Sequence, residues 1–264
     1  MTKNARRPVA LITGASGGIG ADLAELFARD GFDLVLVARS RDKLDDVGAR
    51  LAAAHGIRSV SIEADLGEEG AAARIADETA AAGLDVDALV NNAGFGLYGA
   101  FAETDLARER EMIAVNVTAL TELTKLFLPG MLARNRGWIM NVGSTASFQP
   151  GPLMAVYYAT KAYVLSFSAA LHRELAGTGV NVSALCPGPT ATGFVDAAGM
   201  HKSKLFKRAV VMSSMDVAKL GYAALMRNRA VMVTGWMNRM TVTASKFSPR
   251  GIVTWVVMKM QEPA

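Results

Sequence analysis

The sequence is poor in the residues that build disulfides and metal centres. Its 264 residues include one cysteine, Cys186, and three histidines, His55, His172 and His201, which lie far apart in the chain. One cysteine cannot form an intramolecular disulfide, and the scattered histidines lack the spacing of a metal site. We therefore expect neither a structural disulfide nor a bound metal, and the cysteine content gives no sign of an oxidising compartment.

Long hydrophobic runs and linker-like segments are also missing. No stretch approaches the roughly 20 apolar residues of a membrane-spanning helix, and the basic residues 1–8 lead straight into a strand-like run rather than a cleavable signal. We therefore expect a cytoplasmic protein. No Pro-rich, Ser-rich or low-complexity stretch divides the chain. Residues 1–264 are thus expected to form a single domain, whose 51% hydrophobic content suffices for a sizeable core.

Short apolar runs alternate with segments of helical periodicity along the chain. The runs are rich in Val, Ile and Leu without strict two-residue alternation, which is typical of a sheet buried on both faces. The repeated strand–helix–strand order favours a parallel sheet with right-handed crossovers. We therefore predict an α/β fold with a doubly wound parallel sheet. The predicted strands are Val9–Thr13, Asp33–Ala38, Ser59–Ile62, Ala88–Asn91, Trp138–Val142, Asn181–Leu185 and Ala230–Val233.

A glycine-rich turn follows the first predicted strand. Gly14, Gly18 and Gly20 belong to the segment Thr13–Gly20, which opens into a predicted helix over Ala21–Asp30. Glycines let the backbone turn tightly and approach a pyrophosphate at the positive end of a helix. Because the turn lies between the first strand and the first helix, it predicts a dinucleotide site.

Tyr157 and Lys161 are four residues apart in a helical segment, so their side chains share one face. A free phenol has a pKa of about 10, which is too high for easy proton exchange at neutral pH. A nearby ammonium group favours the phenolate, and we therefore expect Lys161 to lower the pKa of Tyr157. Tyr157 is thus predicted to be a general acid and base. The neighbouring Tyr158 lacks such a partner, because Ala162 is four positions after it.

These motifs together resemble the short-chain dehydrogenase/reductase family. The glycine spacing and the Tyr-x-x-x-Lys pair match that family, and the matches keep their order over residues 9 to 192. The further matches are Asp65-Leu66, Asn91–Gly94, Asn116, Ser144 and Pro187–Thr192. The resemblance implies a single-domain Rossmann-like fold of about seven strands in the order 3-2-1-4-5-6-7. An epimerase or dehydratase of the extended branch of the family is a further alternative. That branch has a different glycine spacing, so the resemblance disfavours it.

The resemblance also assigns roles to individual residues. Ser144 would hold and polarise the substrate carbonyl, although Ser147 is an alternative hydroxyl. Asn116, in a helix predicted over Ala107–Arg134, would support a water that links Lys161 to solvent, and Asp65 would contact adenine. The predicted catalytic residues are Asn116, Ser144, Tyr157 and Lys161. The predicted cofactor contacts are Gly14, Ser16, Gly18, Ile19, Gly20, Arg39, Asp65, Leu66, Asn92, Ala93, Gly94, Tyr157, Lys161, Pro187, Gly188, Thr190 and Thr192.

The end of the second strand indicates which nicotinamide cofactor binds. Folds that select NAD usually carry an acidic residue there, which accepts a hydrogen bond from the ribose 2′-hydroxyl. This chain has Ala38, followed by Arg39, whose guanidinium can form paired bonds to a 2′-phosphate. Ser16 adds a hydroxyl, and Arg41 and Lys43 add positive charge. The pattern favours NADP(H) over NAD(H).

The substrate side carries weaker signals. Residues 189–215 follow a strand and lack a strand pattern, which predicts a lid. The basic run 201–208 within them is either a solvated helix face or a contact for a phosphate-bearing substrate such as an acyl thioester. Candidate pocket walls are Phe95, Leu97, Tyr98, Phe148, Leu153 and Phe194, with Ser144 at the reacting carbonyl. Ketone, 3-oxoacyl, steroid-like and sugar-derived carbonyls all stay open, as does the direction of the reaction.

Residues 235–264 are basic and rich in aromatic residues and Met. From Met200 onward the chain holds eleven Lys or Arg against two acidic residues, a net charge of +9, whereas the first 199 residues carry −5. A basic amphipathic segment is typical of a helix on an anionic membrane. Packing on the core or against a second subunit explains the apolar residues equally well. No nucleic-acid motif accompanies the charge, so no nucleic-acid partner is predicted.

The sequence thus predicts an oxidoreductase that moves hydride between NADP(H) and a carbonyl or alcohol. A non-catalytic NADP(H)-binding sensor or scaffold is the alternative, because a fold alone does not establish activity. The resemblance further implies a homodimer or homotetramer, built through the long helices that contain Asn116 and Tyr157.

Overall fold

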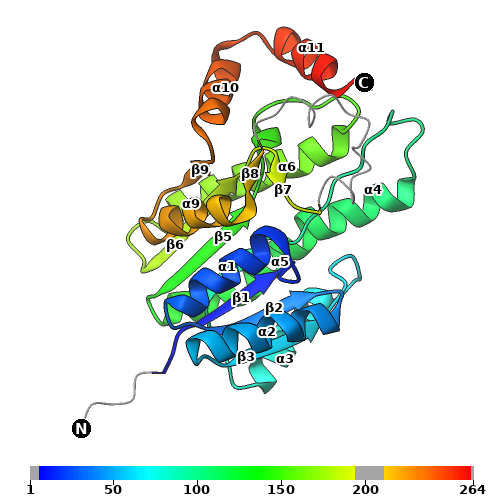
Figure 1. Ribbon diagram of the computed structural model, residues 1–264. Helices are drawn as coiled ribbons and strands as arrows, with labels where there is room; N and C mark the ends of the chain where they lie inside the picture. Colours follow the sequence, from blue (N-terminus) through cyan, green and yellow to red (C-terminus); the bar gives the residue numbers. More distant parts are fainter. Residues whose placement is uncertain (1–5, 194–210, 263–264) are drawn as a thin grey trace.

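A seven-stranded parallel sheet forms the centre of the computed structural model (Figure 1), which describes residues 6–193 and 211–262. All of its strand pairs are parallel. In spatial order the strands are β3 (Ser59–Glu63), β2 (Asp33–Ala38), β1 (Val9–Thr13), β4 (Val86–Asn91), β5 (Gly137–Val142), β6 (Val180–Cys186) and β9 (Val231–Val233). The predicted doubly wound sheet is confirmed, and each predicted strand is present with its ends within two residues.

Helices cover both faces of this sheet because successive side chains of each strand point to opposite sides. One face packs on α1 (Gly18–Arg29), α2 (Arg41–His55) and α9 (Ser214–Met226). The other packs on α3 (Ala71–Ala81), α5 (Leu120–Ala133) and α6 (Ala155–Glu174). Phe27 and Leu36 are fully buried on the first face and Leu11 and Ile75 on the second. Burial of each such side chain stabilises the fold by about 1.5–3 kcal/mol.

The helix predicted over Ala107–Arg134 is three consecutive segments. These are α4 (Leu106–Ile113), a π-helical turn (Ala114–Ala119) and α5. By length and composition the run Leu106–Ala133 is apolar enough to cross a membrane, so the expectation that no segment is so apolar is wrong by this measure. In this fold the run packs against the sheet, and Met112, Val115 and Leu123 are buried.

Two short strands lie within the predicted lid, residues 189–215. β7 (Thr190–Ala191) pairs in parallel with β8 (Met212–Ser213), although the sequence showed no strand pattern over residues 189–215. Two residues are too few to give a periodic signal. Phe194 and the basic run 201–208 lie outside the described residues. After β9 the chain continues into α10 (Trp236–Phe247) and α11 (Arg250–Gln261), which extend beyond the α9 layer in Figure 1.

Candidate active site

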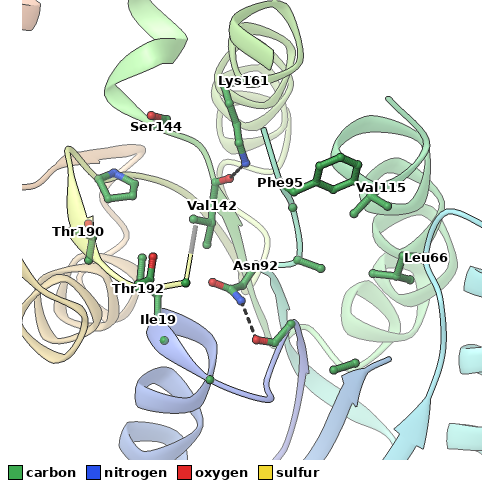
Figure 2. A pocket seen from close by; sticks show the side chains of 18 of the residues that line it. Ile19, Leu66, Asn92, Phe95, Val115, Val142, Ser144, Lys161, Thr190 and Thr192 are labelled. Carbon is green, nitrogen blue, oxygen red and sulfur yellow. Dashed lines mark hydrogen bonds between the residues drawn. The ribbon is translucent and has the colours of Figure 1, made fainter. Parts of the chain in front are cut away.

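A cavity of about 640 Å³ lies at the carboxyl ends of the central strands. This is the crevice in which open parallel sheets bind their ligands. Most of the predicted site residues line it: Gly14, Ser16, Gly18, Ile19, Arg39, Asp65, Leu66, Asn92, Ala93, Gly94, Phe95, Ser144, Tyr157, Lys161, Pro187, Gly188, Thr190 and Thr192. Figure 2 shows Ile19, Thr190 and Thr192 on one side of it and Leu66, Val115 and Phe95 on the other.

The glycine turn is fixed by Asn92, which comes directly after β4. Asn92 Nδ2 donates to Thr13 O at 2.9 Å. It also donates to Gly14 O at 3.2 Å, the bond drawn in Figure 2. Thr13 Oγ1 in turn accepts from the backbone N–H groups of Asn92 and Ala93, both at 3.0 Å. Gly14 has φ +66°, and a Cβ on Gly20 would collide with the Gly14 carbonyl oxygen. Gly20 therefore permits the close packing of helix α1 against the turn, but it does not line the cavity as predicted.

The N-terminus of α1 points its backbone donors toward this turn. Gly17 provides no side-chain cap, and the first turn of the helix contains no acidic residue. The first N–H groups of a helix lack partners within the helix and favour anions there. Gly18 and Ile19 line the cavity at this end. The turn and helix start therefore fit a pyrophosphate.

Arg39 lies at the far end of the cavity between two carboxylates. Its Nη1 is 3.6 Å from Glu111 Oε1 and 3.9 Å from Asp65 Oδ2. Asp65 Oδ1 accepts from Gly67 N at 2.8 Å, which closes the turn after β3. Lys43 lines the same end of the cavity. This end of the cavity therefore holds two cations, Arg39 and Lys43, beside two carboxylates. Glu111, which reaches the site from α4, was not foreseen because no sequence signal connects it to β2.

Arg41 does not line this end of the cavity, although the sequence predicts that it adds positive charge there. Its side chain pairs with Asp45 at 3.0 Å, one turn further along α2, and it is not among the lining residues. The i,i+4 spacing on the helix surface accounts for this pairing.

Ser144, Tyr157 and Lys161 meet at the other end of the cavity. The Ser144 and Tyr157 side chains share a hydrogen bond. Lys161 Nζ is 5.9 Å from the centre of the Tyr157 ring and donates to Val142 O at 2.9 Å, where β5 ends (Figure 2). Burial lowers the pKa of Lys161 to about 8. Helix α6 and the end of β5 thus hold a hydroxyl, a phenol and an amine in one place.

The expectation that Lys161 lowers the pKa of Tyr157 is wrong for this structure. Burial raises the pKa of Tyr157 above its ordinary value, and the hydrogen bond with Ser144 offsets only part of that rise. Burial disfavours the charged form of both groups, so it raises the pKa of a phenol and lowers that of an amine. The Lys161 ammonium is directed at a carbonyl rather than at the phenol oxygen. Tyr157 is therefore a protonated donor at neutral pH.

Asn116 is buried behind the cavity instead of lining it. It lies in the π-helical turn, a feature that is frequent at functional sites. Its Oδ1 accepts from Phe95 N at 3.1 Å, and its Nδ2 donates to Phe95 O at 3.0 Å and to Thr160 Oγ1 at 3.1 Å. A Cβ on Gly94 would lie 2.8 Å from Asn116 Oδ1 and 3.3 Å from Lys161 Nζ. Asn116 thus positions the segment after β4 close to Lys161.

Ser147, the alternative to Ser144, supports it from the next turn. Ser147 Oγ accepts from Ser144 N at 3.2 Å, and Ser144 Oγ accepts from Ala146 N at 3.1 Å. This reciprocal capping begins the short 3₁₀ helix Thr145–Phe148. Ser147 is buried and does not line the cavity.

The substrate end has apolar walls that the sequence identified only in part. Phe95 lines the cavity, whereas Phe148 does not and instead has Lys246 Nζ 5.5 Å from its ring centre. Leu97 and Tyr98 pack just outside, in a cluster that includes Val257 of α11. Leu153 O accepts from Gly99 N at 2.9 Å and thereby joins two loops. The lining residues missed at this end include Ala146, Met154 and Tyr158.

Known proteins share this arrangement. Residues 8–203 match the family model of the short chain dehydrogenases. The very-long-chain 3-oxoacyl-CoA reductase of Bos taurus is 36% identical over 187 residues, which are 69% of this chain and only 59% of that protein. The chain therefore matches less than two thirds of the length of this curated relative.

Two solved structures are similar over nearly their whole length. A short-chain dehydrogenase from Sphingobium yanoikuyae in complex with NADPH is 33% identical with a TM-score of 0.82, and the match covers 93% of this chain and 94% of that one. A short chain dehydrogenase/reductase from Burkholderia phymatum in complex with NAD is 30% identical with a TM-score of 0.80, covering 90% and 92%. With its parallel sheet, its glycine turn and the shared cavity of Ser144, Tyr157 and Lys161, this chain belongs to the short-chain dehydrogenase family of oxidoreductases.

Proposed function

We propose that this chain reduces the ketone of an apolar substrate with NADPH, and that the substrate is a 3-oxoacyl thioester. The observation that carries the proposal is that Ser144, Tyr157 and Lys161 line the same cavity as the glycine turn. A dinucleotide bound on the turn would therefore share the cavity with a proton donor. The non-catalytic sensor or scaffold is the alternative that the experiment below separates.

The cofactor site is assigned by the chemistry of its lining. The glycine turn and the start of α1 would hold the pyrophosphate, Asp65 the adenine end, and Thr190 and Thr192 the carboxamide. Arg39 and Lys43 would bind the 2′-phosphate, since no acidic residue ends β2 to accept a bond from the 2′-hydroxyl. When bound, the reduced nicotinamide supplies the hydride.

The chain's own residues supply orientation and a proton. The Ser144 hydroxyl, hydrogen bonded to Tyr157, would hold the substrate oxygen beside the phenol. Because burial raises the pKa of Tyr157, the phenol carries its proton at neutral pH and can donate it to the alkoxide that forms. Lys161, whose Nζ donates to Val142 O rather than to the phenol, would hold the nicotinamide ribose. The protonated form of Tyr157 is the form that the proposed reduction uses.

The walls of the cavity favour an acyl chain over a sugar. Phe95, Ala146, Met154 and Tyr158 lie around the Ser144 end, and a sugar would leave many hydroxyl groups without partners against such walls. The name of the Bos taurus relative specifies a 3-oxoacyl-CoA reductase. Both observations support a ketone with long alkyl substituents.

The test is a carbonyl panel followed by the loss of NADPH absorbance. It compares 3-oxoacyl thioesters of increasing chain length, bulky ketones and sugar ketones. Tyr157→Phe should bind NADPH normally, as measured by fluorescence titration, and lose at least about 100-fold in turnover. The matched control is Tyr163→Phe, which removes an exposed phenol from the same helix.

Three results would count against the proposal. Full activity of Tyr157→Phe would remove the proton-donor role. NADPH binding without turnover of any carbonyl would establish the sensor or scaffold instead. Preference for sugar ketones over 3-oxoacyl thioesters would overturn the substrate class while leaving the reaction intact.

A further inference from the structure

The last two helices leave large apolar side chains exposed to solvent. In α10 and α11 only Val242, Val257 and Gln261 are buried. The exposed large apolar residues are Trp236, Met237, Met240, Phe247, Ile252, Trp255, Val256, Met258 and Met260. Phe247 is 85% exposed and Trp236 is 71% exposed. Proteins that act as isolated monomers rarely expose contiguous apolar patches beyond a few hundred Å². We therefore expect a binding partner to cover these side chains.

Helix α10 presents its apolar side outward. At 100° per residue, Trp236, Met240 and Phe247 fall within about 40° of one another around the helix. On the opposite side Val242 is buried, and Asn238 Nδ2 donates to Thr234 O at 2.8 Å, which fixes the helix start to the end of β9. An amphipathic helix normally turns its apolar face to the core, and α10 does the reverse.

Helix α11 is arranged in the same way. Ile252, Trp255 and Val256 share its exposed side. Val257 and Gln261 are on the other side, where they pack on the protein body next to Tyr98 and Tyr158. The helix is therefore docked through one side while its aromatic and aliphatic side stays in solvent.

The charges around this surface have one sign. Residues 235–261 contain Arg239, Lys246, Arg250 and Lys259 and no acidic residue. Lys259 pairs with Glu262 at 2.7 Å, whereas Arg239, Lys246 and Arg250 form no ion pair with any residue in the described part of the chain. Cations at the rim of an exposed apolar face complement the phosphates of an anionic bilayer. Tryptophan in addition favours the boundary between membrane and water.

A second copy of this chain fits the surface less well. Most homodimers use the same patch on both subunits, which here would bring the unpaired Arg239, Lys246 and Arg250 of each subunit close to those of the other. Like charges at such an interface destabilise it. A bilayer instead buries the apolar side chains and neutralises the cations together.

We propose that the outward side of α10 and α11 docks on the surface of an anionic phospholipid bilayer. The docking surface consists of Trp236, Met240, Phe247, Ile252, Trp255 and Val256. Arg239, Lys246 and Arg250 belong to the same two helices and add positive charge near it. Because α11 also contacts Tyr98 and Tyr158, docking brings the bilayer close to the apolar end of the cavity.

The experiment is co-sedimentation of the full chain with vesicles. Phosphatidylcholine vesicles are compared with vesicles of phosphatidylcholine and phosphatidylglycerol. The chain should bind the anionic vesicles and should be released as salt is added. Each cation near an anionic surface contributes about fivefold to binding, so Arg239→Gln with Arg250→Gln should weaken binding about 25-fold. Phe247→Ser with Trp255→Ser should abolish it.

The matched control is Phe101→Ser with Leu106→Ser, which removes two comparably exposed apolar side chains outside α10 and α11. This control should bind vesicles as the unmodified chain does, and circular dichroism verifies that each variant is folded. Failure of the unmodified chain to bind anionic vesicles would overturn the proposal. So would equal losses of vesicle binding in Phe247→Ser with Trp255→Ser and in the control. So would light scattering that shows Phe247→Ser with Trp255→Ser turning an oligomer into a monomer, because the surface would then join two copies. Sedimentation does not depend on turnover, so this result is independent of the proposed reaction.

Discussion

Gln261, the last residue of α11, donates a hydrogen bond from Nε2 to the Tyr158 hydroxyl at 2.6 Å. Its backbone carbonyl accepts a second bond, from the Tyr98 hydroxyl. The Gln261 side chain is fully buried although it lies close to the end of the chain. Tyr158 lines the cavity next to Tyr157. One residue of α11 therefore ties the C-terminal helices to the wall of the substrate end.

Replacing Gln261 by Ala should loosen α11. The change removes the bond to Tyr158 and leaves a gap at a buried position, and one lost hydrogen bond costs about 1 kcal/mol. Amide hydrogen exchange across Arg250–Gln261 should then accelerate by at least about fivefold, while exchange in β1 stays the same. Tyr158→Phe removes the same bond from its other partner and should accelerate the same amides. Unchanged exchange in both variants would show that the Tyr98 bond to the Gln261 carbonyl and the packing of Val257 suffice to hold the helix.

Gly20→Ala should destabilise the protein before any cofactor is added. The new Cβ would collide with the Gly14 carbonyl oxygen and lie 2.6 Å from Asn92 Nδ2, so the turn and its Asn92 bonds must shift. Overpacking of this kind costs about 1–3 kcal/mol. Urea unfolding of the cofactor-free chain measures this loss. The control is Gly17→Ala, whose Cβ would have no neighbour within 4 Å among the described residues, so its free energy of unfolding should stay within about 0.5 kcal/mol of the parent's.

The sheet could be predicted from the sequence because its signals are local. Runs such as residues 34–38 are apolar and bounded by charged residues, here Asp33 and Arg39, and the strand that each predicts needs no knowledge of distant contacts. The cavity residues after β1, β4 and β5 follow from the same reasoning, since the carboxyl ends of parallel strands meet at one edge. Glu111, Met154 and Tyr158 could not be assigned in this way, because only the packing of α4 and α6 brings them to the cavity.

Burial is the second property that the sequence did not provide. The spacing of Tyr157 and Lys161 places them on one side of a helix, but it does not say how much water surrounds them. Both are buried in the structure, and that loss of water decides the direction of both pKa shifts. The π-helical turn that holds Asn116 likewise has no sequence signal, because its residues alone match an ordinary helix.

Arg39→Asp should reverse the proposed preference for NADP(H) over NAD(H). The guanidinium that would bind the 2′-phosphate is replaced by a carboxylate that repels it, close to Asp65 and Glu111. A charged hydrogen bond is worth about 1.5–3 kcal/mol, so kcat/KM for NADPH should fall by at least about tenfold. Arg41→Asp is the control, because Arg41 pairs with Asp45 and does not line the cavity. An unchanged ratio of the two cofactor efficiencies in Arg39→Asp would refute the assignment.

Lys161→Met should change how the free energy of unfolding depends on pH. Burial lowers the pKa of Lys161 to about 8 in the folded chain, from an ordinary value of 10.5. Below pH 8 both states carry the proton, and the folded state bears the full cost of a buried ammonium group. Between the two pKa values the unfolded state binds more protons, so this lysine's contribution to stability rises with pH.

The variant lacks this contribution, so its stability relative to the parent should fall by up to about 1.4 kcal/mol per pH unit above pH 8. Urea unfolding of both cofactor-free proteins at several pH values between 7 and 10 measures the difference, and subtracting the curves removes the titrations that the two proteins share. Lys125→Met is the control, because Lys125 is exposed on α5 and its ammonium stays in water in both states. Its difference from the parent should be the same at every pH. If the Lys161→Met difference were equally flat, the amine would be as well solvated in the folded chain as in the unfolded one, and burial could not be what sets its charge beside Tyr157.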